Sequence, residues 1–212
     1  MADTAGLAYV HLCRGWVHQP QHRYHDALHD AQQALHLYTT AGHAHGQANA
    51  LNNIGWYHAQ LGDYQQAITH CRQALTRQQQ LGNRSWEART WDSLGYAHHH
   101  LTQYQQATTC YEHALTLLRD LHNRYYEAKV LNRLGDTHHA AGNPHTAHKT
   151  WRHAWSILHQ LDHPDAPTVH TKLTRHPEPS ASPPTNGRGA DADPPADRRA
   201  WLRSHDGEPF RR

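Results

Sequence analysis

Apolar positions in the middle of the chain follow the spacing of amphipathic helices. Over residues 48–61, apolar side chains recur at roughly helical intervals, and Gly62 and Asp63 then interrupt the pattern. A second segment with one apolar side covers residues 64–81. Glycine suits a left-handed residue after a helix, and aspartate can accept hydrogen bonds from the free N–H groups of the next helix. The pattern therefore predicts a helix–turn–helix hairpin.

The hairpin recurs at a fixed step, the one that separates Gly15 from Gly55, which we call the repeat period. One column of glycine and two of alanine keep this period: Gly15, Gly55, Gly95 and Gly135; Ala27, Ala67, Ala107 and Ala147; Ala34, Ala74, Ala114 and Ala154. Such a period is typical of a stacked repeat array, which usually presents a surface to a partner. A glycine within a helix costs about 1 kcal/mol relative to alanine. Its repetition predicts that another backbone passes too close for a side chain.

Residues 94–96 (Leu-Gly-Tyr), with Ala107 and Ala114 at their spacing, resemble the tetratricopeptide repeat (TPR) signature. The repeat period is similar to that of a longer-helix TPR variant found in regulatory arrays. The resemblance implies an all-α, right-handed superhelix (a solenoid) of about four helix–turn–helix pairs. It divides residues 1–173 into repeats at about 8–47, 48–87, 88–127 and 128–167, followed by a short cap.

The first copy departs from the pattern. Arg14 stands in the column occupied by Ile54, Leu94 and Leu134, and residues 19–21 (Gln-Pro-Gln) replace the regular turn. This copy also places apolar residues near the start of the chain, where a terminal repeat normally presents a polar face.

A narrower resemblance is to the C-terminal TPR arrays of bacterial SARP-like and STAND-type regulators. It is carried by residues 51–55, 61–64, 81–84, 134–136 and 161–166. In those proteins the array follows a DNA-binding domain and an NTPase domain. We expect neither here, because the sequence has no glycine-rich phosphate loop with a lysine and no DNA-reading module before residue 8.

Composition narrows the function classes. The net charge of +2 is spread over mixed acids and bases, so nothing favours nucleic acid as a partner. No apolar run approaches the 18 or so residues of a membrane span. The three cysteines, Cys13, Cys71 and Cys110, have no metal-like spacing, and Cys71 and Cys110 are expected to be buried free thiols. A cytoplasmic location fits best.

The amino-acid composition changes from Thr174 onward, where proline, serine, glycine and charged residues dominate. Such a segment buries too little apolar surface to offset its ordering entropy, so residues 174–212 are predicted to be a disordered tail. Residues 164–173 are expected to cap the last helix pair.

Histidine is unusually abundant, with 25 copies. His18, His58, His98 and His138 form another column, but equivalent atoms in successive repeats lie roughly 10 Å apart, too far to share a metal ion. We assign this column to helix packing. Other histidines have i, i+4 spacing without a catalytic zinc pattern, and no nucleophile or carboxylate pair has a partner pattern. The sequence predicts no metal site, no cofactor and no enzyme activity.

The inner face of the array is the candidate site. The TPR resemblance places these residues on the concave groove: Asn49, Asn52, Asn53, Trp56, Arg89, Asp92, Tyr96, Lys129, Asn132, Arg133 and Asp136. Asparagine can bond a peptide backbone, aromatic rings supply contact area and basic residues can hold a carboxylate. Lys129 and Arg133 match two positions of the clamp that chaperone-binding TPRs use for a C-terminal carboxylate, but Trp56 and Ser93 replace its asparagines.

Three hypotheses follow. The leading one is a non-enzymatic scaffold or adaptor that binds a protein or peptide in the concave groove, without nucleic acid or membrane partners. The alternative is a detached or truncated sensor arm of a bacterial transcriptional regulator or nucleotide-switch protein. The third is self-association through the N-terminal repeat, whose end exposes apolar area.

Overall fold

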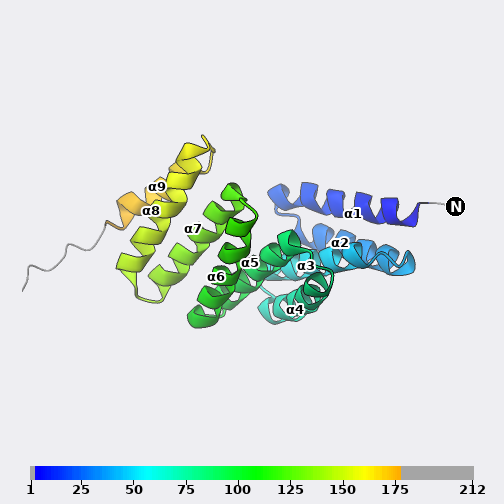
Figure 1. Ribbon diagram of the computed structural model, residues 1–212. Coiled ribbons are helices and arrows are strands. Elements are labelled where there is room, and N and C mark those ends of the chain that lie inside the picture. The colour runs from blue at the N-terminus through cyan, green and yellow to red at the C-terminus, as the bar shows by residue number, and fades with distance from the viewer. Residues whose placement is uncertain (1–2, 178–212) are drawn as a thin grey trace, which may run out of the picture. The chain divides into compact units, whose positions relative to one another are not determined.

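The computed structural model describes residues 3–177, which are helical except at short turns (Figure 1). Within this range there is no strand. The helices are α1 (Thr4–His18), the 3-10 turn η1 (Gln19–Gln21), α2 (Tyr24–Thr40), α3 (Ala44–Leu61), α4 (Tyr64–Gln80), α5 (Arg84–His100), α6 (Tyr104–Asp120), α7 (Arg124–Ala140), α8 (Pro144–Gln160) and α9 (Ala166–Arg175). The predicted disordered tail lies outside the described residues, apart from its first four positions. Of these, Thr174 and Arg175 end α9.

Consecutive helices form hairpins that stack in chain order. Helices α1 and α2, α3 and α4, α5 and α6, and α7 and α8 pack as pairs, and each second helix packs against the first helix of the next pair. This confirms the expected all-α solenoid and the four helix pairs. The hairpins begin at Ala44, Arg84 and Arg124, slightly before the expected repeat boundaries, because each helix starts directly after its turn.

The turns that connect the helices recur at half of the repeat period. A residue with positive φ occupies each turn: Gly42, Gly62, Gly82 and Gly142, and also His22, Thr102, His122 and Asp162. Glycine adopts this left-handed conformation without steric cost, whereas Thr102, with φ 58°, is β-branched and therefore strained there. The even spacing of the turns gives the helices between them similar lengths. One repeat period therefore contains two helices, each followed by a turn.

The glycine column marks close helix contacts, but mostly with side chains. A Cβ on Gly95 would lie 2.6 Å from Cε1 of Tyr111, and one on Gly135 would lie 2.3 Å from Cδ1 of Trp151. At Gly55 the neighbours are Cys71 Sγ, at 2.4 Å, and a backbone carbonyl oxygen at 3.0 Å. The expectation of a passing backbone is therefore correct only in part, since a bulky side chain of the second helix fills most of the space.

Two members of the histidine column contact the turn of their own hairpin. Nδ1 of His98, which is buried, lies 2.6 Å from Oε1 of Gln103, and Nδ1 of His58 lies 3.3 Å from Oδ2 of Asp63. The Asp63 side chain thus contacts a histidine instead of capping α4, where it makes no cap hydrogen bond, and that detail of the turn prediction is wrong. Among residues 3–177 no three histidine, cysteine or acidic side chains are grouped to hold a metal ion.

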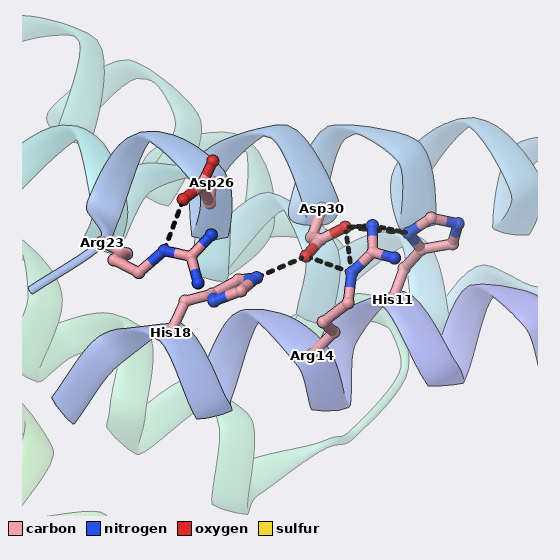
Figure 2. A network of polar contacts seen from close by, with 6 residues as sticks. All are labelled: His11, Arg14, His18, Arg23, Asp26 and Asp30. Atoms are coloured by element: carbon pink, nitrogen blue, oxygen red, sulfur yellow. Dashed lines mark hydrogen bonds and ion pairs between the residues drawn. The ribbon is translucent and has the colours of Figure 1, made fainter. Parts of the chain in front are cut away.

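The first hairpin contains a polar cluster in place of an apolar contact (Figure 2). Asp30 of α2 is 1% exposed, and the Arg14 guanidinium donates to both of its carboxylate oxygens, with Nε 2.8 Å from Oδ2. His11 Nδ1 lies 3.0 Å from Oδ1, and His18 Nε2 lies 3.5 Å from Oδ2. Burial raises the pKa of Asp30, but the hydrogen bonds from Arg14 and His11 outweigh it and hold the pKa below its usual value. Arg14 therefore departs from the repeat pattern because it pairs with Asp30.

The opposite end of the array is closed by α9. Ala166 and Val169 are buried and join the apolar cluster of α6, α7 and α8. The segment 164–173, which is expected to be a cap, contributes these two residues to the contact. No helix within the described range is long and apolar enough to cross a bilayer.

Candidate functional site

A hollow of about 460 Å³ opens along the first helices of the hairpins. Its walls come from α1 and η1, α3, α5 and α7: Trp16, Gln19, Pro20, Asn52, Asn53, Trp56, Trp86, Arg89, Asp92, Ser93, Tyr126, Lys129 and Arg133. We call this hollow the groove. Residues from opposite ends of the array's sequence meet in it because the first helices of successive hairpins lie on the same side of the array.

Most of the residues expected at the site line the groove: Asn52, Asn53, Trp56, Arg89, Asp92, Lys129 and Arg133. Tyr96 lies just beneath, with its ring centre 5.1 Å from that of Trp56. Asn49 is half-buried on α3, outside the lining. Asn132 and Asp136 are placed differently, at the end of α7 that contacts α9.

Arg133 is held in place by its neighbours. It forms a short ion pair with Asp92, and its guanidinium carbon lies 4.9 Å from the ring centre of Trp56 and 5.5 Å from that of Tyr96. Burial lowers the pKa of Arg133, but Asp92 more than offsets this and raises it above the usual value, so the guanidinium stays charged. Of the two basic residues that match the carboxylate clamp, this one is already paired within the chain.

Two further cations face the groove without an acidic partner. Arg89 lies between Trp86 and Tyr126, 5.0 Å and 4.2 Å from their ring centres. Lys129 Nζ lies 5.5 Å from the ring centre of Tyr126. Neither cation forms an ion pair with a described acidic side chain. Burial, and secondarily the charge of Arg133, lower the pKa of Lys129, because its charged form loses hydration there without gaining an acidic partner.

Three residues of the groove lining have a buried polar atom without a hydrogen-bond partner within residues 3–177. These atoms are Oδ1 of Asn52, Nδ2 of Asn53 and Oδ1 of Asp92. Asn52 and Asn53 are only 4% and 6% exposed. Buried polar groups normally find a partner, because an unpaired one costs about 1–3 kcal/mol. Such atoms on two neighbouring residues of α3 and on Asp92 of α5 therefore mark the groove as a candidate binding site.

The far end of the inner face is occupied by α9. Lys172 Nζ donates to Oδ1 of Asn132, at 2.7 Å, and to both carboxylate oxygens of Asp136, at 2.6 and 2.7 Å. Asp136 Oδ1 also accepts from Trp151 Nε1, at 3.0 Å. The polar groups of these two predicted site residues therefore already bind partners from α8 and α9.

Comparison with protein-family models matches residues 6–80 and 86–158 to the family described as tetratricopeptide repeat. These segments cover more than half of the chain. The chain belongs to the tetratricopeptide repeat family. A comparison with curated protein sequences gave no match.

Solved structures resemble the TPR array at low sequence identity. BtubC from P. vanneervenii matches with a TM-score of 0.59 and 19% identity, over 86% of this chain and 71% of BtubC. A Rap protein complexed with Competence and Sporulation Factor matches with a TM-score of 0.72 and 16% identity, over 79% of this chain. TPR-like repeats of a kinesin light chain protein from Podosopora anserina give 0.65 and 14%, over 83% and 87% of the two chains. This array spans 47% of the Rap chain.

Several residues of the groove lining were not predicted from the sequence. Trp86 and Tyr126 occupy the first turns of α5 and α7, one repeat period apart. The expected repeats begin at 88 and 128, so these two aromatic residues fell at the end of the preceding copies. Aromatic residues at equivalent positions, one helical turn before Arg89 and Lys129, are the signal that could have found them. Trp16, Gln19 and Pro20 were missed because the first copy departs from the pattern.

Proposed function

We propose that the array is a non-enzymatic module that binds an extended peptide segment in the groove, with an acidic side chain or a terminal carboxylate of the peptide beside Arg89 and Lys129. The observation that carries the proposal is the set of unpartnered polar atoms beside unpaired cations. The family supports it in general terms, since TPR proteins are interaction scaffolds and one structural neighbour was solved with Competence and Sporulation Factor.

The two asparagines of α3 suit a peptide backbone. An extended peptide offers N–H and C=O groups that have no partner within the peptide itself. Oδ1 of Asn52 can accept from such an N–H, and Nδ2 of Asn53 can donate to such a C=O. Because both atoms are buried and unpaired in the array alone, the bonds gained on binding are not offset by bonds lost within the protein.

Charge sets the preference among peptides. The groove lining carries three cations, Arg89, Lys129 and Arg133, and one acid, Asp92, which Arg133 neutralises. Two positive charges remain. A carboxylate placed between them makes charge-assisted hydrogen bonds and raises the lowered pKa of Lys129. Trp56, Trp86 and Tyr126 supply apolar contact area on either side.

The test is selection of displayed random peptides on the 212-residue chain, followed by fluorescence anisotropy with the enriched peptides. We expect the selected peptides to be rich in Asp or Glu or to require a free C-terminus. Asn52→Ala and Lys129→Ala should each weaken binding about 10- to 100-fold, as expected for the loss of one hydrogen bond to a charged or buried group. Binding should also weaken as salt rises.

Lys149→Ala is the matched control, because Lys149 is an exposed lysine on α8, outside the groove lining. It removes the same charge and should leave the affinity unchanged. Equal binding by the Lys129→Ala and Lys149→Ala variants, or selected peptides without acidic groups, would contradict the proposal.

A second candidate, the ligand-sensing arm of a larger regulator, is favoured by the likeness to Rap proteins, of which this array covers under half. In that case the same groove would bind the signal, and an effector domain would read it. Genomic sequence encoding such a domain in the same reading frame would support this candidate.

A further inference from the structure

The outer face of α1 differs from the equivalent face of every later hairpin. The column of Val10 continues with Ala50, Thr90 and Val130, and the column of Val17 continues with Tyr57, Ala97 and Thr137. Val10 and Val17 are 58% and 60% exposed, whereas none of their six equivalents exceeds 1%. The same positions are thus solvent-facing in the first hairpin and fully buried in the other three.

The later hairpins show what normally covers this face. Ala50 of α3 packs in one apolar cluster with Ala34 and Tyr38 of α2, and Tyr57 packs with Ala27 and Ala31 of the same helix. In the next hairpin, Thr90 donates to Oε1 of Gln78 on α4, at 2.7 Å. The face is therefore the docking face for a neighbouring helix. Among residues 3–177, α1 packs on η1, α2 and α3, and no helix covers this side of it.

The uncovered face of α1 is apolar. Leu7, Val10 and Val17 form a stripe at i, i+3 and i+10, and Leu7 is 51% exposed. Tyr9 and Trp16 extend it on one side, with their rings packed edge to face at 6.5 Å. A terminal repeat that ends an array in water normally carries polar residues here. A contiguous apolar patch of this kind marks an interaction surface.

The α1 helix carries little charge that would disfavour its burial in a contact with a second copy. Arg14 is the one Lys, Arg, Asp or Glu residue of α1. Its side chain is about half exposed, but its guanidinium is bound to the buried Asp30 carboxylate of α2, which neutralises its charge (Figure 2). When two copies of α1 approach each other, each Arg14 is therefore already paired within its own copy.

The other end of the array offers no complement to this stripe. There α9 covers α8 through Ala166 and Val169, and its exposed residues are mainly polar: Thr168, His170, Thr171, Thr174 and Arg175. Head-to-tail stacking of copies would place these polar side chains on the apolar stripe. An isologous contact, in which the same face is used by both copies, instead pairs apolar with apolar.

We propose that α1 is a dimerisation surface, on which the α1 helix of a second copy of this chain packs antiparallel, so that Val10 of one copy lies near Val17 of the other. The contact is continuous with the established interface between hairpins, and the second copy occupies the place that a preceding second helix occupies elsewhere. Because Trp16 borders the stripe and also lines the groove, the contact brings the α1 ends of two grooves together.

Sedimentation velocity of the 212-residue chain over a range of micromolar concentrations tests this surface. We expect a monomer–dimer equilibrium for the unaltered chain and a monomer at all these concentrations for the Val10→Glu, Val17→Glu double variant. Because both side chains are more than half exposed, the variant should keep its helical circular dichroism and thermal midpoint. Leu121→Glu, at an exposed leucine on the turn after α6, is the matched control and should still dimerise.

Crosslinking tests the pairing geometry. In a Cys13→Ser background, a mixture of Val10→Cys and Val17→Cys chains treated with a short bismaleimide should give more 10–17 product than either 10–10 or 17–17 product. A monomeric unaltered chain throughout the range would overturn the proposal, as would a double variant that still dimerises. Predominant 10–10 and 17–17 products would overturn the antiparallel arrangement.

Discussion

The glycine column offers a paired experiment in which one substitution acts in opposite directions at equivalent positions. In Gly95→Ala, the new Cβ would lie 2.6 Å from Cε1 and 2.7 Å from Cδ1 of Tyr111. Both distances are about 1 Å shorter than normal carbon–carbon contact. Tyr111 is 1% exposed, so its ring cannot swing into solvent to make room. In Gly15→Ala, the nearest atom is the Tyr57 hydroxyl oxygen, at 3.2 Å, and a shift of a few tenths of an ångström suffices.

The balance between helix propensity and steric overlap decides whether alanine stabilises or destabilises the chain at each position. Alanine gains about 1 kcal/mol over glycine in a helix interior. Overpacking a filled core costs about 1–3 kcal/mol, and three ring atoms closer than 3.0 Å place Gly95 at the upper end. Gly95→Ala should therefore lose about 2 kcal/mol, whereas Gly15→Ala should gain about 0.5–1 kcal/mol. For a chain of this size the loss lowers the thermal midpoint by about 4–8 °C.

The assay is thermal and urea unfolding of the two variants followed by circular dichroism. A third measurement places Gly95→Ala in a Tyr111→Ala background, where the clash is absent and the alanine should stabilise the chain. If Gly95→Ala unfolds at or above the midpoint of the unaltered chain, or if Tyr111→Ala leaves its effect unchanged, side-chain packing does not explain the glycine column.

Three other predictions concern pH, thiol reactivity and one strained turn. Burial lowers the pKa of four histidines: His70, His99, His100 and His138. The unfolded chain therefore binds more protons than the folded chain below the ordinary histidine pKa. The free energy of unfolding, measured by urea titration, should fall as the pH drops through about 6.5. A midpoint that rises on acidification would contradict this. Burial raises the pKa of the Cys71 thiol, and that of Cys110 to about 11, so a thiol reagent should label half-buried Cys13 first in the folded chain; equal rates for all three would count against burial. Thr102→Gly should raise stability by about 0.5–1 kcal/mol in urea unfolding, because it relieves a left-handed β-branched residue, and a loss would show that the threonine is not strained.

The helical hairpins could be predicted from the sequence because each depends on local signals that repeat. Apolar spacing, the turn glycines and the periodic columns together determine where α4 begins and that hairpins stack. What fills the space over each glycine could not be predicted in the same way. At Gly55, Gly95 and Gly135 these residues are Cys71, Tyr111 and Trp151, which keep the spacing but not the identity, whereas at Gly15 the nearest side chain is Tyr57 of the next hairpin. A column whose residue type changes in each copy gives no repeat signal.

The groove residues that could be predicted are those that recur at equivalent positions of successive repeats. Asn52, Arg89 and Lys129 follow from helix position and the TPR resemblance, and the structure brings them into one hollow. The pairing of Lys172 with Asp136 could not be foreseen, because no earlier copy has a lysine at the position equivalent to Lys172. The pairing of Arg133 with Asp92 joins side chains from two different repeats, and neither has an equivalent ion pair in the first two hairpins.

The positive-φ turns, which recur at half of the repeat period, also constrain how the chain can change in length. Removing residues 44–83 would join the end of one hairpin to Arg84, and every remaining column would keep its register. Removing a single helix with its turn would instead place a second helix where a first helix belongs. The inner face would then no longer be formed by first helices alone. Recombination in steps of two helices thus keeps the helix order and changes the length of the inner face, but it also creates a new packing contact, because Trp86 would stand where Gly46 now lies against the Tyr38 ring. A change in the length of the inner face therefore requires new side-chain packing only where the two joined hairpins meet.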